Sequence, residues 1–280
     1  MKDAAVALLL VLGLASPLCA QTAPAPATQQ PIEVTLHDVR SAAERGDADA
    51  QNRLGEIYAR GHGIQQDDAQ AAAWYRKAAD QGLADAQFNL GVLYVDGRGV
   101  PKDYAQAANW YRKAAEQGSA YAQFNLAILY VDGQGVAKDY AQATTWLHKA
   151  ADQGIARAQY GLGLMYLDGQ GVTQSDTEAA SWFRKAADQG NAKAQYNLGL
   201  MYDNGQGVTQ DYTEAANLYR KAADQGHPRA QYSLGLLYYN GQGVTRDIWQ
   251  AESLFRKAAE QGDPEAREAL QKIQAPRKAG

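Results

Sequence analysis

The stretch Ala192–Gly226, AKAQYNLGLMYDNGQGVTQDYTEAANLYRKAADQG, decides the fold because nearly the same sequence returns every 36 residues. A glutamine, a leucine three residues later and a tyrosine four residues after that mark the register. These three series are Gln51, Gln87, Gln123, Gln159, Gln195 and Gln231; Leu54, Leu90, Leu126, Leu162, Leu198 and Leu234; and Tyr58, Tyr94, Tyr130, Tyr166, Tyr202 and Tyr238. A fixed period of this length indicates stacked supersecondary units. We therefore interpret the chain as a repeat protein before assigning any chemistry.

The composition is that of a foldable chain without a basic surface. Of the 280 residues, 46% are hydrophobic and 21% are charged, and the formal net charge is −4. Nucleic-acid-binding domains carry a basic footprint, whereas weak acidity mainly supports solubility. We expect no nucleic-acid partner.

The first twenty residues have the layout of a secretory signal peptide. Lys2 precedes an apolar run over Ala4–Ala15, and a small residue follows at Ala20. The run is too short to span a bilayer. We expect cleavage after Ala20, no integral membrane span in the mature chain and a periplasmic or secreted location in a bacterium. The alternative is an apolar N-terminal helix.

The single cysteine, Cys19, lies inside this segment. Cleavage after Ala20 removes it, so the mature chain would form no disulfide and no cysteine-based metal site. Leu18 stands where a lipid-anchored protein would have a small residue, which argues against a lipid anchor.

Beyond the signal peptide the sequence predicts a linker, a cap, six repeats and a second cap. Residues 21–31 are rich in Pro, Ala, Thr and Gln, which indicates a disordered spacer. The predicted segments are the signal peptide 1–20, the linker 21–31, an N-terminal capping helix 32–46, repeats 47–82, 83–118, 119–154, 155–190, 191–226 and 227–262, a C-terminal half-repeat helix 263–274 and a disordered tail 275–280.

Each repeat predicts two antiparallel helices. In the second repeat the first helix is expected over Ala84–Asp96 and ends at Gly97, a residue suited to the left-handed conformation. The second helix begins after Asp103, which with Gln106 has capping-box spacing, and ends near Gly118. For the first helices we expect good N-caps at Asp47, Ser119, Asn191 and Asp263, and poorer ones at Leu83, Ile155 and His227.

A glycine in the middle of the first helix predicts a close contact between the paired helices. Glycine costs near 1 kcal/mol relative to alanine in a helix interior. Five repeats nevertheless have glycine here, including Gly199, whereas the third has Ala127. We therefore expect Gly199→Leu to overpack the helix pair.

The repeated sequence pattern resembles the Sel1-like repeat, a relative of the tetratricopeptide repeat, over roughly residues 47–274. Leu218 replaces the tryptophan usual in this pattern. The positions that carry the resemblance in the fifth repeat are Ala194, Tyr196, Leu198, Gly199, Tyr202, Gly205, Gly207, Val208, Asp211, Ala215, Lys221, Ala222, Ala223 and Gly226.

The resemblance implies an all-α fold, an α-solenoid of antiparallel helix pairs forming a right-handed superhelix. It also implies a non-enzymatic scaffold for protein–protein contacts, often in bacterial envelope or secreted proteins. Some secreted relatives brace each repeat with a disulfide. This chain lacks the cysteines for that, so helix packing alone must hold it together.

No constellation of catalytic or ligand-binding residues stands out. The Gly-x-Gly turns follow a helix and continue with Val or Ile, unlike a dinucleotide fingerprint. No nucleophile, base and orienting group can be assembled. We expect no catalytic residues, no cofactor and no metal. Two alternatives stay open: an envelope hydrolase acting on cell-wall or β-lactam substrates, suggested only by cysteine-rich relatives, and binding of cell-wall glycan by aromatic rows such as Trp74, Trp110, Trp146 and Trp182.

The candidate binding surface is the variable arc of the first helices. Residues that stay fixed share one arc of the helical wheel, and the residues opposite change from repeat to repeat. The candidates are Asp85, Tyr121, Arg157, Lys193 and Arg229 in a first row, Asn89, Asn125 and Asn197 in a second, and Val92, Ile128, Leu164 and Leu200 in a third. If the first helices line the inner curve, these rows pave a groove for a protein or an extended peptide.

The predicted groove differs in charge between its ends. Asp49, Glu56 and Asp85 make one end acidic, and Arg157, Lys193 and Arg229 make the other basic. Under the alternative interpretation these side chains only pack one first helix on the next, or face solvent. We expect a monomer with a protein or peptide partner.

Overall fold

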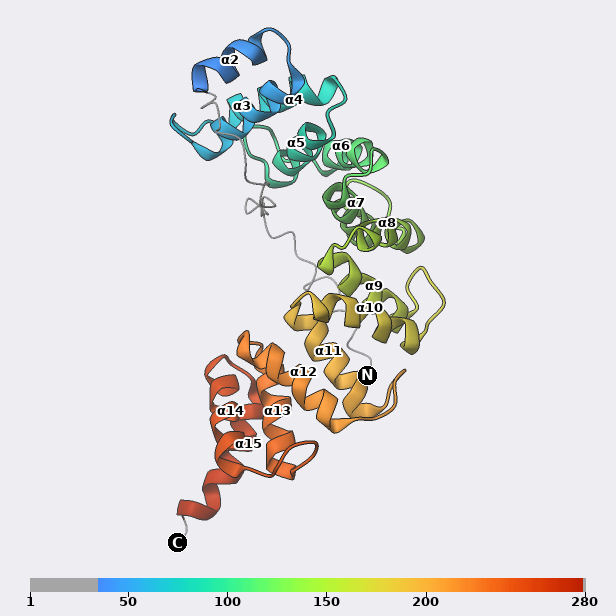
Figure 1. The fold of residues 1–280 in the computed structure, drawn as a ribbon, viewed down its shortest axis with the longest axis vertical. Helices are drawn as coiled ribbons and strands as arrows, with labels where there is room; N and C mark the ends of the chain where they lie inside the picture. Colours follow the sequence, from blue (N-terminus) through green and yellow to red (C-terminus); the bar gives the residue numbers. More distant parts are fainter. Residues whose placement is uncertain (1–34, 279–280) are drawn as a thin grey trace, which may run out of the picture. The chain divides into compact units, whose positions relative to one another are not determined.

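The computed structural model describes residues 35–278, and within them the chain forms fourteen α-helices and no strands (Figure 1). Within each of its two compact units consecutive helices pack on one another, which confirms the predicted all-α solenoid of antiparallel helix pairs. The structure divides into two compact units, unit 1 up to Gln153 and unit 2 from Gly154.

Each unit is built from thirteen-residue helices in pairs, with a terminal cap. We call the first helix of each pair its A helix and the second its B helix. In unit 1 a cap α2 (Leu36–Glu44) precedes the pairs α3 (Ala48–Arg60) and α4 (Asp68–Asp80), α5 (Ala84–Asp96) and α6 (Tyr104–Glu116), and α7 (Ala120–Asp132) and α8 (Tyr140–Asp152). In unit 2 the pairs are α9 (Ala156–Asp168) and α10 (Asp176–Asp188), α11 (Ala192–Asn204) and α12 (Tyr212–Asp224), and α13 (Pro228–Asn240) and α14 (Ile248–Glu260), followed by a cap α15 (Pro264–Lys278).

The two caps differ somewhat from their predicted limits. α2 covers the first pair, with Val39 and Ala43 buried against Leu54. The predicted signal peptide (1–20) and linker (21–31) lie outside the described residues. α15 continues to Lys278, past the expected end at Gln274, so residues 275–278 are helical rather than a tail. Pro276 lies in the last turn, where its missing N–H costs one backbone hydrogen bond without ending the helix.

Helix limits inside the repeats follow the predicted signals. The A helix of the second pair ends at Gly97, whose φ of 70° is left-handed and whose N–H donates to the Leu93 carbonyl (2.9 Å). Gly99, two residues on, touches the backbone of Asp68 at the start of α4, where any Cβ would collide with the Asp68 carbonyl. The Gly-x-Gly turn therefore docks one repeat on the preceding one.

The N-cap residues of the B helices are the predicted ones, but the reciprocal half of the capping box is not formed at α6, where the N–H of Asp103 donates to the carbonyl of Tyr94 (3.0 Å) instead of to the Gln106 side chain. Oδ1 of Asp103 accepts hydrogen bonds from the N–H groups of Ala105 and Gln106 at the start of α6.

The N-caps of the A helices follow the prediction only in part. Ser119, expected to be a good cap, makes no side-chain cap hydrogen bond. His227, expected to be a poor one, caps α13 because its Nδ1 accepts from the N–H of Ala230 (3.2 Å).

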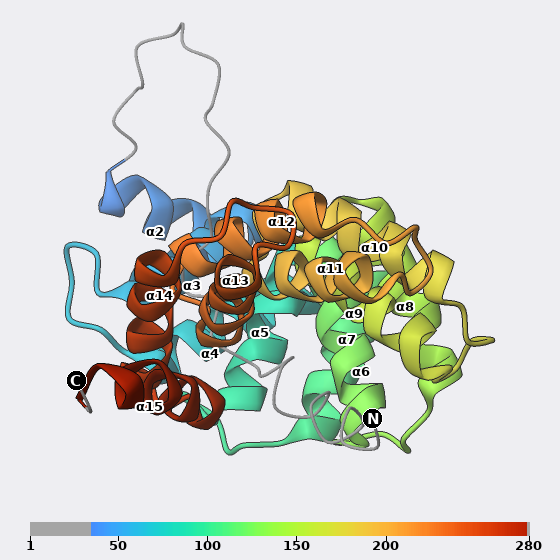
Figure 2. The same ribbon diagram turned by 90° about the horizontal axis from the view of Figure 1, so that it is seen from below.

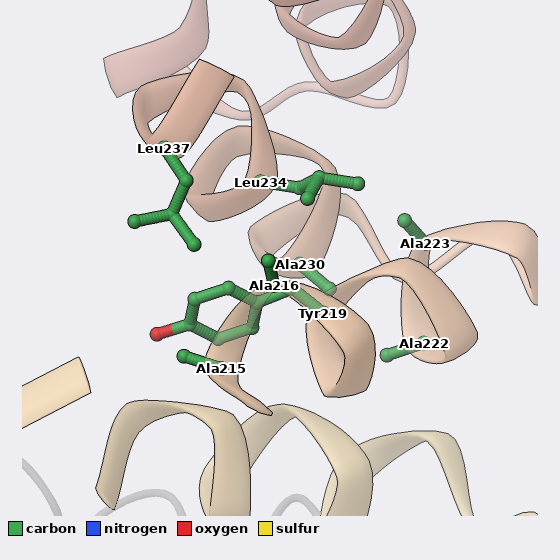
Figure 3. Close-up of a cluster of buried hydrophobic side chains, with 8 residues drawn as sticks. All are labelled: Ala215, Ala216, Tyr219, Ala222, Ala223, Ala230, Leu234 and Leu237. Carbon is green, nitrogen blue, oxygen red and sulfur yellow. The ribbon is translucent and has the colours of Figure 1, made fainter. Parts of the chain in front are cut away.

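The mid-helix glycines allow the aromatic rings of the B helices to approach closely. A Cβ atom at Gly199 would lie 2.7 Å from Cδ1 of Tyr219, a fully buried ring. Figure 3 shows that ring among side chains of α12 and α13, with Leu237 pointing toward it. In the third repeat the equivalent positions carry Ala127 and Leu147, so the larger A-helix residue occurs with a non-aromatic B-helix residue.

A buried glutamine joins three consecutive helices, and we call this arrangement the glutamine link. Nε2 of Gln51 donates to the carbonyl of Ala43 on α2 (3.0 Å), and its Oε1 accepts from Nε2 of Gln81, the C-cap of α4 (2.7 Å). The link recurs with Gln87, Gln123, Gln195 and Gln231 as the central residue. Both ends of each buried amide are thus satisfied, as the interior requires.

Candidate protein-binding surface

The first candidate row consists of the second residue of each A helix, and all its members are exposed. In unit 1 these residues are Asp49, Asp85 and Tyr121. Tyr121 is 55% exposed, and its ring centroid lies 6.2 Å from that of Phe88 on α5. An exposed aromatic ring supported by a neighbouring ring offers an anchor at low entropic cost.

In unit 2 the same row carries the cations Arg157, Lys193 and Arg229. Arg157 and Lys193 are exposed on α9 and α11. Arg229 is exposed too, but it makes ion pairs with the cap helix. Its Nε lies 3.3 Å from Oδ2 of Asp263, and its Nη1 lies 2.8 Å from Oε1 of Glu265.

These ion pairs change the predicted role of Arg229. The hydrogen bond that Arg229 donates to Glu265 raises the pKa of Arg229, although burial opposes the shift. The Arg229 guanidinium therefore helps to dock α15 on α13 and does not present an unneutralised charge to a groove. Glu265 stands 36 residues after Arg229, so this ion pair joins neighbouring positions of the same row, and the charge of a single helix does not reveal it.

The second row, of amides, mostly joins neighbouring helices. Nδ2 of Asn89 donates to Oδ1 of Asn52 on the preceding A helix (3.1 Å). Nδ2 of Asn197 donates to the hydroxyl of Tyr160 (3.4 Å). Asn125 is buried and hydrogen-bonded to Tyr111 of α6. For these residues the interpretation as packing contacts accounts for the observed geometry.

The third row divides into buried and half-buried residues. Val92 and Ile128 are 8% and 1% exposed, so they belong to the core of unit 1 and do not line an open groove. Leu164 and Leu200 are half-buried, and Leu200 packs against the Tyr219 cluster. A helical wheel treats all repeats alike, whereas the extent of burial depends on what surrounds each helix.

The tryptophans of the B helices are core residues. Trp110, Trp146 and Trp182 are buried, and a lysine of the same helix lies over each ring. Nζ of Lys113, for example, lies 4.0 Å from the centroid of the Trp110 ring. These three rings therefore belong to the repeat core, and Trp74 is half-buried beside the first cap.

A pocket between α13, α14 and α15 was not predicted from the sequence. These three helices lie together at one end of unit 2 (Figure 2). The pocket has a volume of about 190 Å³, and Tyr232, Phe255 and Ala269 contribute to its wall, with Glu265 and Glu268 among its polar lining. The signal was present in the sequence, since Ala269 stands in the position of Asn197 and Ser233, and Glu268 in the position of Tyr196 and Tyr232.

Two kinds of feature are absent from the described residues. Between residues 35 and 278, no three His, Cys, Asp or Glu side chains gather as a metal-binding group would. Over the same range no helix combines the length and apolar character needed to cross a membrane.

Paired helices in a fixed repeat, with a variable exposed row on the A helices, define a helical-repeat solenoid. The chain belongs to the Sel1 repeat family: the model of that repeat matches residues 48–83, 84–119, 120–155, 156–191, 192–227 and 228–263. Sel1-repeat proteins are generally protein-interaction scaffolds, and the fold is typically non-catalytic. A comparison with curated proteins gave no match.

Two solved structures illustrate the similarity. A protective antigen present in uropathogenic Escherichia coli strains, which displays this fold, is 42% identical with a TM-score of 0.84, over 88% of this chain and 53% of that one. The chain therefore spans about half the length of that relative. A Sel1 repeat protein from Oxalobacter formigenes is 34% identical with a TM-score of 0.68, over 80% of this chain and 87% of that one.

Proposed function

We propose that this protein is a non-enzymatic scaffold of the bacterial cell envelope that binds a protein or extended peptide along the exposed row of its A helices. The supporting observation is that the second residue of the A helix varies and stays exposed while the surrounding frame is constant. Ala86, Gln87 and Leu90 belong to that frame, and all three are buried. Variation on a rigid scaffold commonly marks recognition.

Within this proposal the two units recognise different chemistry. The row of unit 1 offers Asp49, Asp85 and the ring of Tyr121, whereas Arg157 and Lys193 in unit 2 suit an acidic segment. Opposite charges across an interface steer association and fix register more than they raise affinity. The half-buried Leu164 and Leu200 would add apolar contact beside the cations.

The proposed location rests on the signal-peptide pattern of residues 1–20. Under this proposal the protein is exported, cleaved after Ala20 and works as a monomer in the periplasm or outside the cell. Cell fractionation followed by mass measurement of the mature N-terminus tests it. A mature chain that begins elsewhere than Gln21, or that stays in the cytoplasm, would contradict it.

Photo-crosslinking in the native envelope tests the binding surface. A photoreactive amino acid at Tyr121 or Lys193 should capture the same partner, identified by mass spectrometry. The same residue at Asn109 or Ser181, exposed positions on B helices, should not. Equal capture at all four positions would contradict the assignment of the surface.

Charge reversal then tests the contribution of unit 2. With the captured partner in purified form, Arg157→Glu combined with Lys193→Glu should weaken binding at least tenfold. Lys221→Glu, at an exposed position of the B helix α12, is the matched control and should leave affinity unchanged. Both variants should keep the melting temperature of the unaltered protein, because exposed substitutions rarely change stability much.

A further inference from the structure

The pocket of unit 2 exists because the last repeat junction breaks a pattern. At the two preceding junctions within unit 2 the sixth residue of one A helix is hydrogen-bonded to the fifth residue of the preceding A helix. Tyr160 is bonded in this way by Asn197, and Tyr196 by Ser233. Tyr232 is the next fifth residue in the series, and the residue that should reach it is Ala269. A methyl group makes no hydrogen bond and leaves space.

The second substitution at this junction is Glu268, in the position where the repeats of unit 2 have Tyr160, Tyr196 and Tyr232. The ring that would otherwise continue the aromatic series is missing, and the pocket of about 190 Å³ remains beside Tyr232 and Phe255. The two ring centroids are 5.6 Å apart. The volume suffices for a planar group, since an engineered apolar cavity of about 150 Å³ holds benzene.

The charges around this pocket do not balance. The carboxylates of Asp263, Glu265 and Glu268 all raise the pKa of Tyr232, in addition to the larger effect of burial. Two cations oppose them: Arg229 pairs with Asp263 and Glu265, and Lys272 pairs with Glu268 (2.8 Å). Three carboxylates against two cations leave one negative charge.

One carboxylate oxygen has an open acceptor position. Oε1 of Glu265 binds Arg229, but Oε2 is buried and makes no hydrogen bond within the chain. A buried acceptor without a partner is costly and rare in folded proteins. The Lys272–Glu268 pair does not supply a donor to it and is largely exposed, so it is weak and can move aside.

We propose that this pocket binds one arginine side chain of the partner, whose guanidinium donates to Oε2 of Glu265 and stacks on the ring of Tyr232. A guanidinium is planar, carries several donors in one plane and stacks on aromatic faces, so it meets both walls at once. A lysine lacks the planar face, and a phenylalanine would leave Oε2 unpaired. The inference rests on the proposed function, because the arginine belongs to the bound protein or peptide.

The pocket adjoins the exposed row, because Glu265 is the second residue of α15 and so continues that row beyond Arg229. A partner of unit 2 would thus present acidic residues toward Arg157 and Lys193 and an arginine toward α15. This order of charges also fixes the direction in which a peptide lies.

The test uses a small probe, so that it does not depend on finding the partner. N-acetyl-arginine N-methylamide is titrated into the full-length mature protein and followed by NMR chemical shifts. The citrulline counterpart has nearly the same shape without the charge. We expect saturable binding of the arginine probe, with shifts confined to α13–α15, and binding of the citrulline probe at least tenfold weaker.

Two variants locate the site. Ala269→Asn copies the amide of Asn197, fills the slot and should abolish probe binding without lowering the melting temperature. Glu265→Gln should weaken binding at least tenfold. Asp224→Asn, at an exposed carboxylate on α12, is the matched control and should bind as the unaltered protein does.

Three results would overturn the inference: equal binding of the two probes, full binding by Ala269→Asn, or tighter binding of the phenylalanine counterpart. These outcomes are distinguishable from failure of the proposed function. If the arginine probe does not bind but crosslinking at Lys193 still captures the partner, only the inference about the pocket fails. If the probe binds but crosslinking captures no partner, only the scaffold proposal fails.

Discussion

The third and fifth helix pairs share one frame but are built differently inside. α7 and α11 both have thirteen residues and end at a left-handed glycine, yet nine residues of α7 are buried against five of α11. The same position carries exposed Tyr121 in one helix and exposed Lys193 in the other. A repeat therefore fixes where its helices lie, while the extent of burial and the surface chemistry are chosen separately in each copy.

The contact between the helices of each pair shows the clearest difference. In the fifth pair Gly199 meets the ring of Tyr219, and in the third pair Ala127 occurs with Leu147. Both solutions leave the two residues buried. The comparison indicates that the contact requires a matched combination of A-helix and B-helix residues, and that glycine is needed only where the B-helix residue is aromatic.

The largest expected effect comes from placing a large A-helix residue opposite the aromatic ring of the fifth pair. Gly199→Leu places a branched side chain against the ring of Tyr219 and should destabilise unit 2 by about 3 kcal/mol, measured by urea unfolding. An unchanged unfolding midpoint would refute the packing role of Gly199.

A double-mutant cycle in the third pair is the control. Leu147→Tyr alone should be destabilising because the ring would meet the methyl group of Ala127. Adding Ala127→Gly should recover about 1 kcal/mol or more, since residues in contact couple by about that amount. Strict additivity of the two changes would contradict the pairwise explanation.

A smaller effect should separate the N-caps of α7 and α11. Oδ1 of Asn191 accepts from the N–H of Ala194 (3.0 Å), whereas Ser119 makes no such bond. Asn191→Ala should cost about 1 kcal/mol, and Ser119→Ala should cost much less, both measured by urea unfolding. Equal losses would show that Ser119 caps its helix in solution.

The smallest effect concerns pH at the start of α13, the helix that follows the fifth pair. Burial, reinforced by Lys193, lowers the pKa of His227 from its ordinary 6.5, and the neutral ring stacks on Tyr196 and caps through Nδ1. Because the unfolded chain binds this proton more readily, the stability contributed above pH 6.5 should be lost as the pH falls through the lowered pKa.

The variant His227→Asn sharpens this comparison because it copies the cap of Asn191. Near pH 8 the variant should have the same urea midpoint as the unaltered protein. Between pH 7 and 5 it should lose less of its free energy of unfolding. If the two proteins show the same pH profile, another group is responsible.

Most of the fold could be predicted from the sequence because its local signals repeat. The limits of α5, the left-handed Gly97 and the aspartate caps each have a short-range cause that a single repeat displays. The signals failed where a contact depends on another element. Ile128 is core and Arg229 is neutralised because of residues outside their own helices.

The candidate site was less predictable for the same reason. The second row was expected to face a partner, but Asn89 and Asn197 join A helices, and that partnership spans neighbouring repeats. The pocket beside Tyr232 could have been found by reading the half-repeat against the full ones. A departure such as Ala269 is informative only once the contact it removes is known.

The glutamine link sets how such an array can change in length. Gln87 needs a carbonyl from the helix before it and an amide from the end of its own repeat, here Ala79 and Gln117. Removing or inserting a whole period restores the contacts among the central glutamine, the preceding carbonyl and the following glutamine. A change of any other length leaves a buried amide without its hydrogen bonds. The array can therefore lengthen only by whole repeats. A gene duplication of one full period would add one more exposed A-helix position for recognition, on a helix pair that is already stably packed.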